Sequence, residues 1–272
     1  MDTKLLARMR PLKIREPRYN TDRHRFFKER GWICVEDVLS CDEAEQARVE
    51  LVRMAKDKLG NEDRHVKDLA ASDYDRLAQA VNEPSRYSDV FRRIVRSPKI
   101  AEIVKEVTGL SSIRVFRDLG LIKAPESEKG IATGVHQDLP FYPMDRCGGA
   151  AIWLALCDLP AEAGTLRFVD ASHKWGPVGR YVLPGQDWLA AHPEDEELMT
   201  EPLALSAGSA TIHDGLMLHG TDPNRWNQHR FGYTIAYMPA DARFTGMPTR
   251  WTDGLGLKVD GLFDHEFFPV VG

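Results

Sequence analysis

The chain has 272 residues and a formal net charge of −5, and 43% of its residues are hydrophobic. This length is sufficient for a substantial core, and the negative charge argues against general binding of nucleic acid. No run of about 18 apolar residues is present to cross a membrane. The four cysteines form no Cys-x-x-Cys pair, and the first residues lack the apolar stretch of a signal peptide. We therefore expect a cytoplasmic protein with reduced thiols.

The first part of the chain predicts helices. Residues 21–30 are typical of a short helix, and 32–35 of a strand. Ser40 and Glu43 have the spacing of a capping box, so a second helix is expected to begin there. A third helix is expected over 97–109, because a proline at its first position is preorganised for helix.

Beyond residue 111 the pattern changes to short β-prone runs separated by turn residues. Because helices precede the strands and do not alternate with them, a sandwich or barrel is favoured over a parallel sheet. We expect a single domain, divided into a mainly helical part (1–110), a β core (111–240) and a C-terminal segment (241–272). The expected strands lie near 112–117, 119–123, 134–138, 150–157, 165–169, 209–213 and 230–238.

Three segments allow two interpretations each. The basic segment 1–30 is either an arm that binds phosphate or a solvated terminus. The polar segment 60–84 is either a loop over an active site or a plain surface connection. Residues 175–200, which interrupt the strands, are either a lid or a solvated excursion.

The motif His136-Gln137-Asp138 places an imidazole and a carboxylate two residues apart. In a strand, side chains at i and i+2 leave the same face, with Cα atoms roughly 6.5–7 Å apart, so both can bind one metal ion. The best candidate for a third ligand is His219. Two histidines and one carboxylate form the facial triad of non-haem Fe(II) oxygenases.

Further pieces of the sequence share order and spacing with a known family. Arg230 follows His219 by eleven residues and begins an apolar, alternating run. With these features, the chain resembles the phytanoyl-CoA dioxygenase family of Fe(II)/2-oxoglutarate oxygenases. One departure is Asp170-Ala171, where the family usually has Pro-Gly. The matching pieces are Leu121–Pro125, His136–Pro140, Ile152–Leu156, Ala163–Lys174 and Ala207–Pro239.

The resemblance implies a fold and a reaction. The fold is a double-stranded β-helix, a cupin-like jelly roll, with N-terminal helices packed outside it. Fe(II), 2-oxoglutarate and O2 are the implied cofactor and cosubstrates, with succinate and CO2 as products. The substrate is a small molecule whose identity stays open, and hydroxylation is the favoured oxidation.

The resemblance also implies which residues hold the cosubstrate. Arg230 is expected to bind the far carboxylate of 2-oxoglutarate, because a guanidinium matches a carboxylate with two parallel hydrogen bonds. Thr221 is expected to add a hydroxyl bond to the same group. Lys123, Gln137 and Trp153 are expected to line this pocket.

Residues on the substrate side are less defined by the sequence. Phe141, Tyr142 and Trp251 are expected to line the substrate pocket. Arg117 and Asp118 lie on an early strand, and whether they face the cavity stays open. His213, six residues before His219, is expected outside the site because Asp214-Gly215 interrupts its strand.

Two other classes of protein compete with the oxygenase interpretation. One is a jelly-roll binding module without a redox role, against which Arg230 and the complete triad argue. The other is a Zn-dependent hydrolase that uses a metal-bound water.

Overall fold

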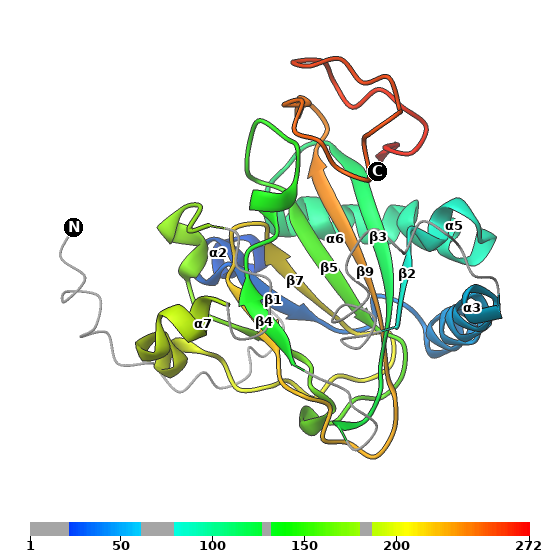
Figure 1. The fold of residues 1–272 in the computed structure, drawn as a ribbon, viewed down its shortest axis with the longest axis vertical. Coiled ribbons are helices and arrows are strands. Elements are labelled where there is room, and N and C mark those ends of the chain that lie inside the picture. The colour runs from blue at the N-terminus through cyan, green and yellow to red at the C-terminus, as the bar shows by residue number, and fades with distance from the viewer. Residues whose placement is uncertain (1–21, 61–78, 127–131, 180–186) are drawn as a thin grey trace.

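The structure is a computed structural model that describes residues 22–60, 79–126, 132–179 and 187–272. The basic arm lies outside the described residues except for its last part, as do most of the 60–84 segment and the middle of the 175–200 segment. The described chain forms two antiparallel sheets with helices outside them (Figure 1).

The larger sheet has seven strands among the described residues, and all of its pairings are antiparallel. Six of these strands follow one another in the order β1 (Trp32–Val35), β7 (Ala210–Asp214), β5 (Ala150–Ala155), β9 (Arg230–Pro239), β3 (Ile113–Lys123) and β10 (Val270–Val271). The seventh strand, β2 (Gln79–Asn82), pairs with β3 outside this order.

The smaller sheet has the order β4 (Thr133–His136), β8 (His219–Thr221) and β6 (Leu166–Phe168). It lies against the inner face of the larger sheet, where Phe168 of β6 stacks on Trp32 of β1 with ring centroids 5.0 Å apart. Two facing antiparallel sheets are the architecture of a jelly roll. The expected mainly β fold, with helices preceding the strands, is confirmed.

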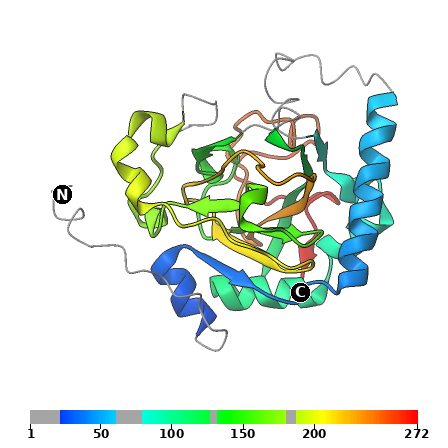
Figure 2. The same ribbon diagram turned by 90° about the horizontal axis from the view of Figure 1, so that it is seen from below.

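Helices cover the outer face of the larger sheet. In Figure 2, α3 lies along one edge of the molecule and α6 lies beneath the strands. The apolar side chains of these helices and the outward-facing residues of β1, β3, β5, β7 and β9 form one core. The four helices are α2 (Arg23–Arg30), α3 (Cys41–Gly60), α5 (Asp89–Val95) and α6 (Pro98–Thr108).

The predicted helix signals are confirmed by the hydrogen bonds at helix ends. The backbone N–H of Ser40 donates to Glu43 Oε2 at 2.8 Å, and the N–H of Glu43 donates to Ser40 Oγ at 3.2 Å. The helix expected over 97–109 is α6, which begins after Ser97 and ends at Gly109. The φ of Gly109 is 78°, a left-handed conformation that glycine adopts without strain. None of the described helices is long and apolar enough to span a membrane.

The two strands expected at 112–117 and 119–123 are one strand, β3, with a β-bulge. The register along β9 shifts between Val115 and Arg117, so Phe116 is the extra residue. A bulge interrupts the strict alternation of side chains along a strand. Three short strands of the described chain, β2, β8 and β10, were not expected.

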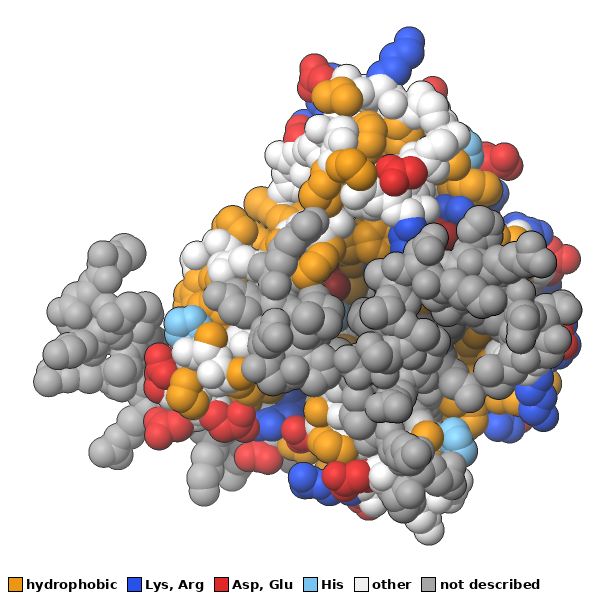
Figure 3. Space-filling view, viewed as in Figure 1, with side chains coloured by type: hydrophobic (Ala, Val, Ile, Leu, Met, Phe, Trp, Pro, Cys, Tyr) orange, Lys and Arg blue, Asp and Glu red, His pale blue; other side chains and the backbone are white. Residues whose placement is uncertain are grey.

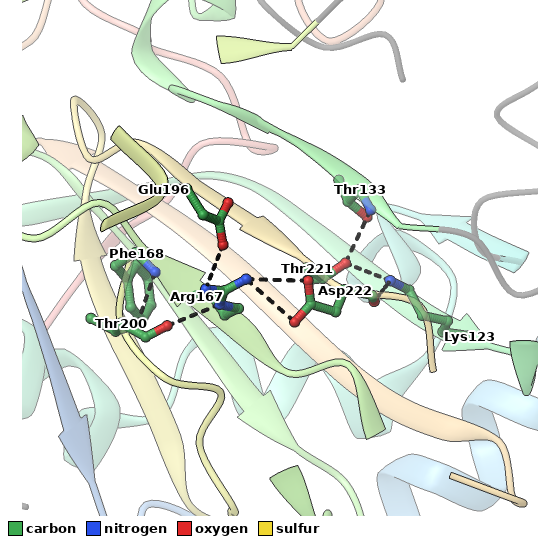
Figure 4. A network of polar contacts seen from close by, with 8 residues as sticks. All are labelled: Lys123, Thr133, Arg167, Phe168, Glu196, Thr200, Thr221 and Asp222. Atoms are coloured by element: carbon green, nitrogen blue, oxygen red, sulfur yellow. Dashed lines mark hydrogen bonds and ion pairs between the residues drawn. The ribbon is translucent and has the colours of Figure 1, made fainter. Parts of the chain in front are cut away.

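The described end of the 175–200 segment is attached to the smaller sheet. It consists of α7 (Trp188–Ala191) and a 3₁₀ helix, η7 (Pro193–Leu198), where the acidic stretch was expected to be helical. Arg167 of β6 donates to Glu196 Oε1 at 3.0 Å and to the Thr200 carbonyl at 2.9 Å (Figure 4). These contacts fix residues 196–200 on the outside of the small sheet.

Candidate active site

The three expected metal ligands converge at one place between the sheets. His136, the last residue of β4, lies directly opposite His219, the first residue of β8. Asp138 follows two residues later, at the start of a 3₁₀ turn and not in the strand as expected, because the chain turns at η4 (Leu139–Phe141). One ligand atom from each residue lies within 4.8 Å of the other two. The His136 Nε2–Asp138 Oδ1 distance is 3.9 Å.

Backbone carbonyl groups orient both imidazoles. Nδ1 of His136 lies 2.7 Å from the Gly134 carbonyl oxygen, and Nδ1 of His219 lies 2.9 Å from that of Met217. Each Nδ1–H donates to its carbonyl, so the lone pair of each Nε2 is directed to the common centre. Two imidazole nitrogens and one carboxylate suit Fe(II), and a donor set of three leaves other positions open for ligands.

The electrostatics keep these groups in the state that a metal requires. Burial lowers the pKa of His219 to about 4 and that of His136 to about 4, and a second histidine beside each adds to the lowering. Both rings are therefore neutral at neutral pH. Burial would raise the pKa of Asp138, but its contact with His213 acts against this and the pKa is lowered overall, so the carboxylate is ionised.

His213 lies at this site, and the prediction that it lies outside was wrong. Its Nε2 is 3.5 Å from Asp138 Oδ2, and its ring centroid is 4.2 Å from that of His219. Its side chain is only 3% exposed, and neither ring nitrogen has a hydrogen-bond partner among the described residues. The strand does end at Asp214, as expected. The chain then turns and crosses from the large sheet to the small one, which returns His219 to the side of His213.

Arg230 lies at the other end of the same interior, at the start of β9. Its guanidinium is buried, and Nη1 donates to the Gly164 carbonyl. Its Nε has no hydrogen-bond partner in the part of the chain that the structure describes. Burial lowers the pKa of Arg230 to about 10, so the group is still charged at neutral pH. A buried cation without a carboxylate partner is costly and fits an anionic ligand.

Lys123 and Thr221 lie beside Arg230. Lys123 is paired with Arg230 across β3 and β9, and its ammonium donates to Thr221 Oγ1 and, at 3.0 Å, to the Asp222 carbonyl. Thr221 Oγ1 also accepts the Thr133 N–H at 3.2 Å, as Figure 4 shows. Because this oxygen accepts two hydrogen bonds, its own hydrogen is available to a ligand. Burial and the charge of Arg230 lower the pKa of Lys123 well below its usual range.

The other two residues expected in this pocket differ in placement. Trp153 lies next to Arg230, with the guanidinium carbon 5.3 Å from a ring centroid. A Cβ at Gly232 would lie 2.2 Å from Trp153 Cζ2, so only glycine leaves room for this ring. Gln137 instead uses its amide on the backbone: Nε2 donates to the Gly176 and Leu216 carbonyls, and Oε1 accepts from Val178.

Aromatic residues gather on the other side of the metal ligands. Tyr142 packs against Phe116 with ring centroids 4.7 Å apart, and Trp251 packs against both rings. Phe141 is partly buried at the end of η4. A small pocket here is lined in part by Asp138, Tyr142 and Ala151. Figure 3, which has the same view as Figure 1, shows a hollow near the centre of the molecule, with hydrophobic and acidic side chains inside it.

The interior of this jelly roll thus holds two histidines and a carboxylate that could bind a metal ion, together with a buried arginine. These features are those of a metal-binding β protein. The family model of phytanoyl-CoA dioxygenase (PhyH) matches residues 27–232. The chain therefore belongs to the phytanoyl-CoA dioxygenase family, as the sequence motifs indicated.

Individual relatives are distant in sequence. Phytanoyl-CoA dioxygenase domain-containing protein 1 of Mus musculus is 29% identical over 174 residues, which are 61% of this chain and 58% of the mouse protein. The chain thus spans less than two thirds of the length of this relative. A probable alpha-ketoglutarate-dependent hypophosphite dioxygenase of Stutzerimonas stutzeri is 25% identical over 235 residues, 81% of this chain and 79% of that protein.

Solved structures share the fold. The non-heme alpha ketoglutarate dependent carbocyclase SnoK from nogalamycin biosynthesis superposes with a TM-score of 0.77 at 23% identity, over 94% of this chain and 97% of SnoK. EctD from S. alaskensis, crystallised with 2-oxoglutarate and 5-hydroxyectoine, gives a TM-score of 0.62 at 19% identity, over 83% and 78% of the two chains. These similarities confirm the jelly-roll fold.

Proposed function

We propose that this protein is an Fe(II)- and 2-oxoglutarate-dependent dioxygenase that oxidises a small-molecule substrate, with succinate and CO2 as co-products. One observation carries the proposal. The same interior holds three groups that could bind one metal ion and, at its other end, a buried arginine with no carboxylate partner among the described residues. A ligand with an anionic end and a metal-chelating end suits both, and 2-oxoglutarate is such a molecule.

In this proposal the residues have distinct tasks. His136, Asp138 and His219 hold the iron, and the carbonyl groups behind the two histidines fix their rings. Arg230 binds the far carboxylate of 2-oxoglutarate, and the Thr221 hydroxyl donates to it. When bound, iron and 2-oxoglutarate supply the oxidising chemistry with O2, while the protein orients them and excludes water.

Other residues support the same pocket. Lys123 lies beside Arg230 and holds Thr221 in place through the bond to its hydroxyl oxygen. Trp153 forms an apolar wall next to the guanidinium. We retain Gln137 as a residue that shapes the pocket through the backbone it binds, and Phe141, Tyr142 and Trp251 as substrate-side residues. Asp138 favours oxygenation, since related halogenases have a small residue in its place.

We also propose that the whole chain acts as one domain in the cytoplasm. The core that joins α3, α5 and α6 to the large sheet supports a single folding unit. The four cysteines form no disulfide, in agreement with a reducing compartment.

The test is an assay of succinate formation under air. Purified protein is supplied with Fe(II), 2-oxoglutarate and a panel of small molecules. We expect succinate release that requires both iron and 2-oxoglutarate, and that increases with a true substrate. Zn(II) in place of iron should give none. Succinate formation that is absent with reconstituted, folded protein, or hydrolysis supported by Zn(II), would contradict the proposal.

A further inference from the structure

The β-bulge in β3 turns one charged side chain into the interior. Without it, Arg117 would share a face with Val115, which packs in the core under the helices. The extra residue Phe116 shifts the register, so Arg117 lies opposite Ala236 of β9, on the inner face. Asp118 then faces the opposite side, where Tyr233 donates to it at 2.7 Å. Bulges commonly redirect a side chain in this way next to active sites.

Arg117 belongs to one row of residues across the inner face of the large sheet. Ala236 lies opposite Ala151 of β5, and Ala151 lies opposite His213 of β7. The row thus has a cation at one end, two alanines in its middle and the histidine that contacts Asp138 at the other. With adjacent strands about 4.8 Å apart, Arg117 and Ala151 start about 10 Å from each other. This span suits one small molecule, and Ala151 also lines the pocket beside Asp138.

Among the residues that the structure describes, none offers a carboxylate partner to the guanidinium of Arg117. Its Cζ lies 4.5 Å from the centroid of the Trp251 ring, and no hydrogen bond or ion pair joins it to a residue that the structure describes. Both nearby carboxylates are committed elsewhere. Glu83 forms an ion pair with Arg86, and Asp118 accepts from Ser85 N at 3.0 Å and from Tyr233.

Stacking on Trp251 limits the orientations that the Arg117 side chain can take, so less entropy is lost when a ligand binds.

We propose that Arg117 binds an oxyanion of the substrate, so that the substrate is a small organic acid. Its carboxylate or phosphonate group lies at Arg117 beside Trp251, and its body extends over Ala236 and Ala151 to the metal ligands. The two alanines provide the space, and the Arg–Trp pair provides recognition. This inference rests on the proposed function, because it assigns a substrate class to that same site.

The test compares acids with their neutral amides on Ni(II)-loaded protein. Binding of 2-oxoglutarate is measured first, by calorimetry, and its site is then saturated. The probes are pentanoate, phenylacetate and 3-phenylpropanoate, each paired with its primary amide, and dissociation constants come from saturation-transfer NMR. We expect at least one acid to bind about tenfold or more tightly than its amide, as for a hydrogen-bonded charge.

Three variants locate this preference. Arg117→Gln should reduce it to near unity, and Arg117→Lys should retain part, because an ammonium cannot reproduce the guanidinium fork. Arg93→Ala, at an exposed arginine of α5, should leave it unchanged. Thermal unfolding checks that each variant is folded. Native protein that prefers no acid, or a preference that survives in Arg117→Gln, would overturn the proposal.

The same samples distinguish two kinds of failure. If 2-oxoglutarate does not bind to the Ni(II)-loaded chain, the proposed function fails, whereas the acid-to-amide ratio and its dependence on Arg117 are still measured. If 2-oxoglutarate binds but no acid is preferred, only the assignment of Arg117 fails.

Discussion

The two ends of the jelly-roll interior are built differently. At the end near Arg230, each polar group is fixed by the backbone: Gly164 accepts from Arg230, Asp222 accepts from Lys123, and Thr133 donates to Thr221. At the end near Arg117, the inner row has two alanines and an arginine whose contact among the described residues is the Trp251 ring. A rigid end with a buried arginine suits a ligand that never changes, and an open end suits the molecule that distinguishes one enzyme from another.

The metal ligands between the two ends should show the largest effect. We expect His136→Ala and His219→Ala each to abolish iron-dependent succinate formation, because a donor is removed from the set of three. Each protein should stay folded, since the outer core is unchanged. The measurement is succinate release together with iron content and circular dichroism. Near-native turnover and iron content in either variant would remove that residue from the metal site.

His213 should have a smaller but distinct effect. We expect His213→Phe to weaken metal binding about 10- to 100-fold, because Asp138 loses the ring nitrogen that lies 3.5 Å from its carboxylate. Phenylalanine keeps a ring of similar shape against Phe168 and His219. Calorimetric titration of Ni(II) into metal-free protein measures the affinity.

A histidine outside the site provides the control for His213. His192 stacks on Trp188 beside η7, so His192→Phe should leave metal affinity unchanged. If His213→Phe and His192→Phe bind Ni(II) equally well, His213 does not position Asp138.

How far the sequence predicts this site depends on how local each signal is. The motif around His136 and Asp138 and the spacing of His219 and Arg230 lie along the chain, so they could be found without a structure. The role of His213 could not be found in this way, because the sequence shows that the strand ends at Asp214-Gly215 but not where the chain goes after the turn. The N–H of Met217 donates to the Asp214 carbonyl at 2.9 Å, and this tight turn brings the rings of His213 and His219 close together, with centroids 4.2 Å apart.

Arg117 escaped prediction for a related reason. Alternation along a strand assigns residues to faces only while the register is regular, and the bulge at Phe116 reverses the assignment. The helices were easier to predict, since capping residues such as Ser40 and Ser97 act within a few positions of themselves. Three-residue β8 carries too little pattern of its own and is formed by pairing with β4 and β6.

The smallest expected effect concerns the turn at Ala171, which lies outside both ends of the interior. A substitution there should change the stability of the fold. Ala171 stands where the family usually has glycine, and it adopts a left-handed φ of 61°. We expect Ala171→Gly to raise the free energy of unfolding by about 0.5–1 kcal/mol, since relief of backbone strain exceeds the added entropy of the unfolded chain. Chemical denaturation measures this value. A destabilised variant would show that the turn tolerates alanine without strain.

The central claim is that Arg230 and the metal ligands jointly hold 2-oxoglutarate. It is tested most directly by anaerobic calorimetry of 2-oxoglutarate with native protein, Arg230→Ala and Arg225→Ala, each with and without Fe(II). Arg225 is an exposed arginine of the same segment, with 67% of its side chain accessible. We predict iron-dependent binding that weakens about 10- to 100-fold in Arg230→Ala and is unchanged in Arg225→Ala. Equal affinity in native protein and Arg230→Ala, or binding that does not depend on iron, would contradict the claim.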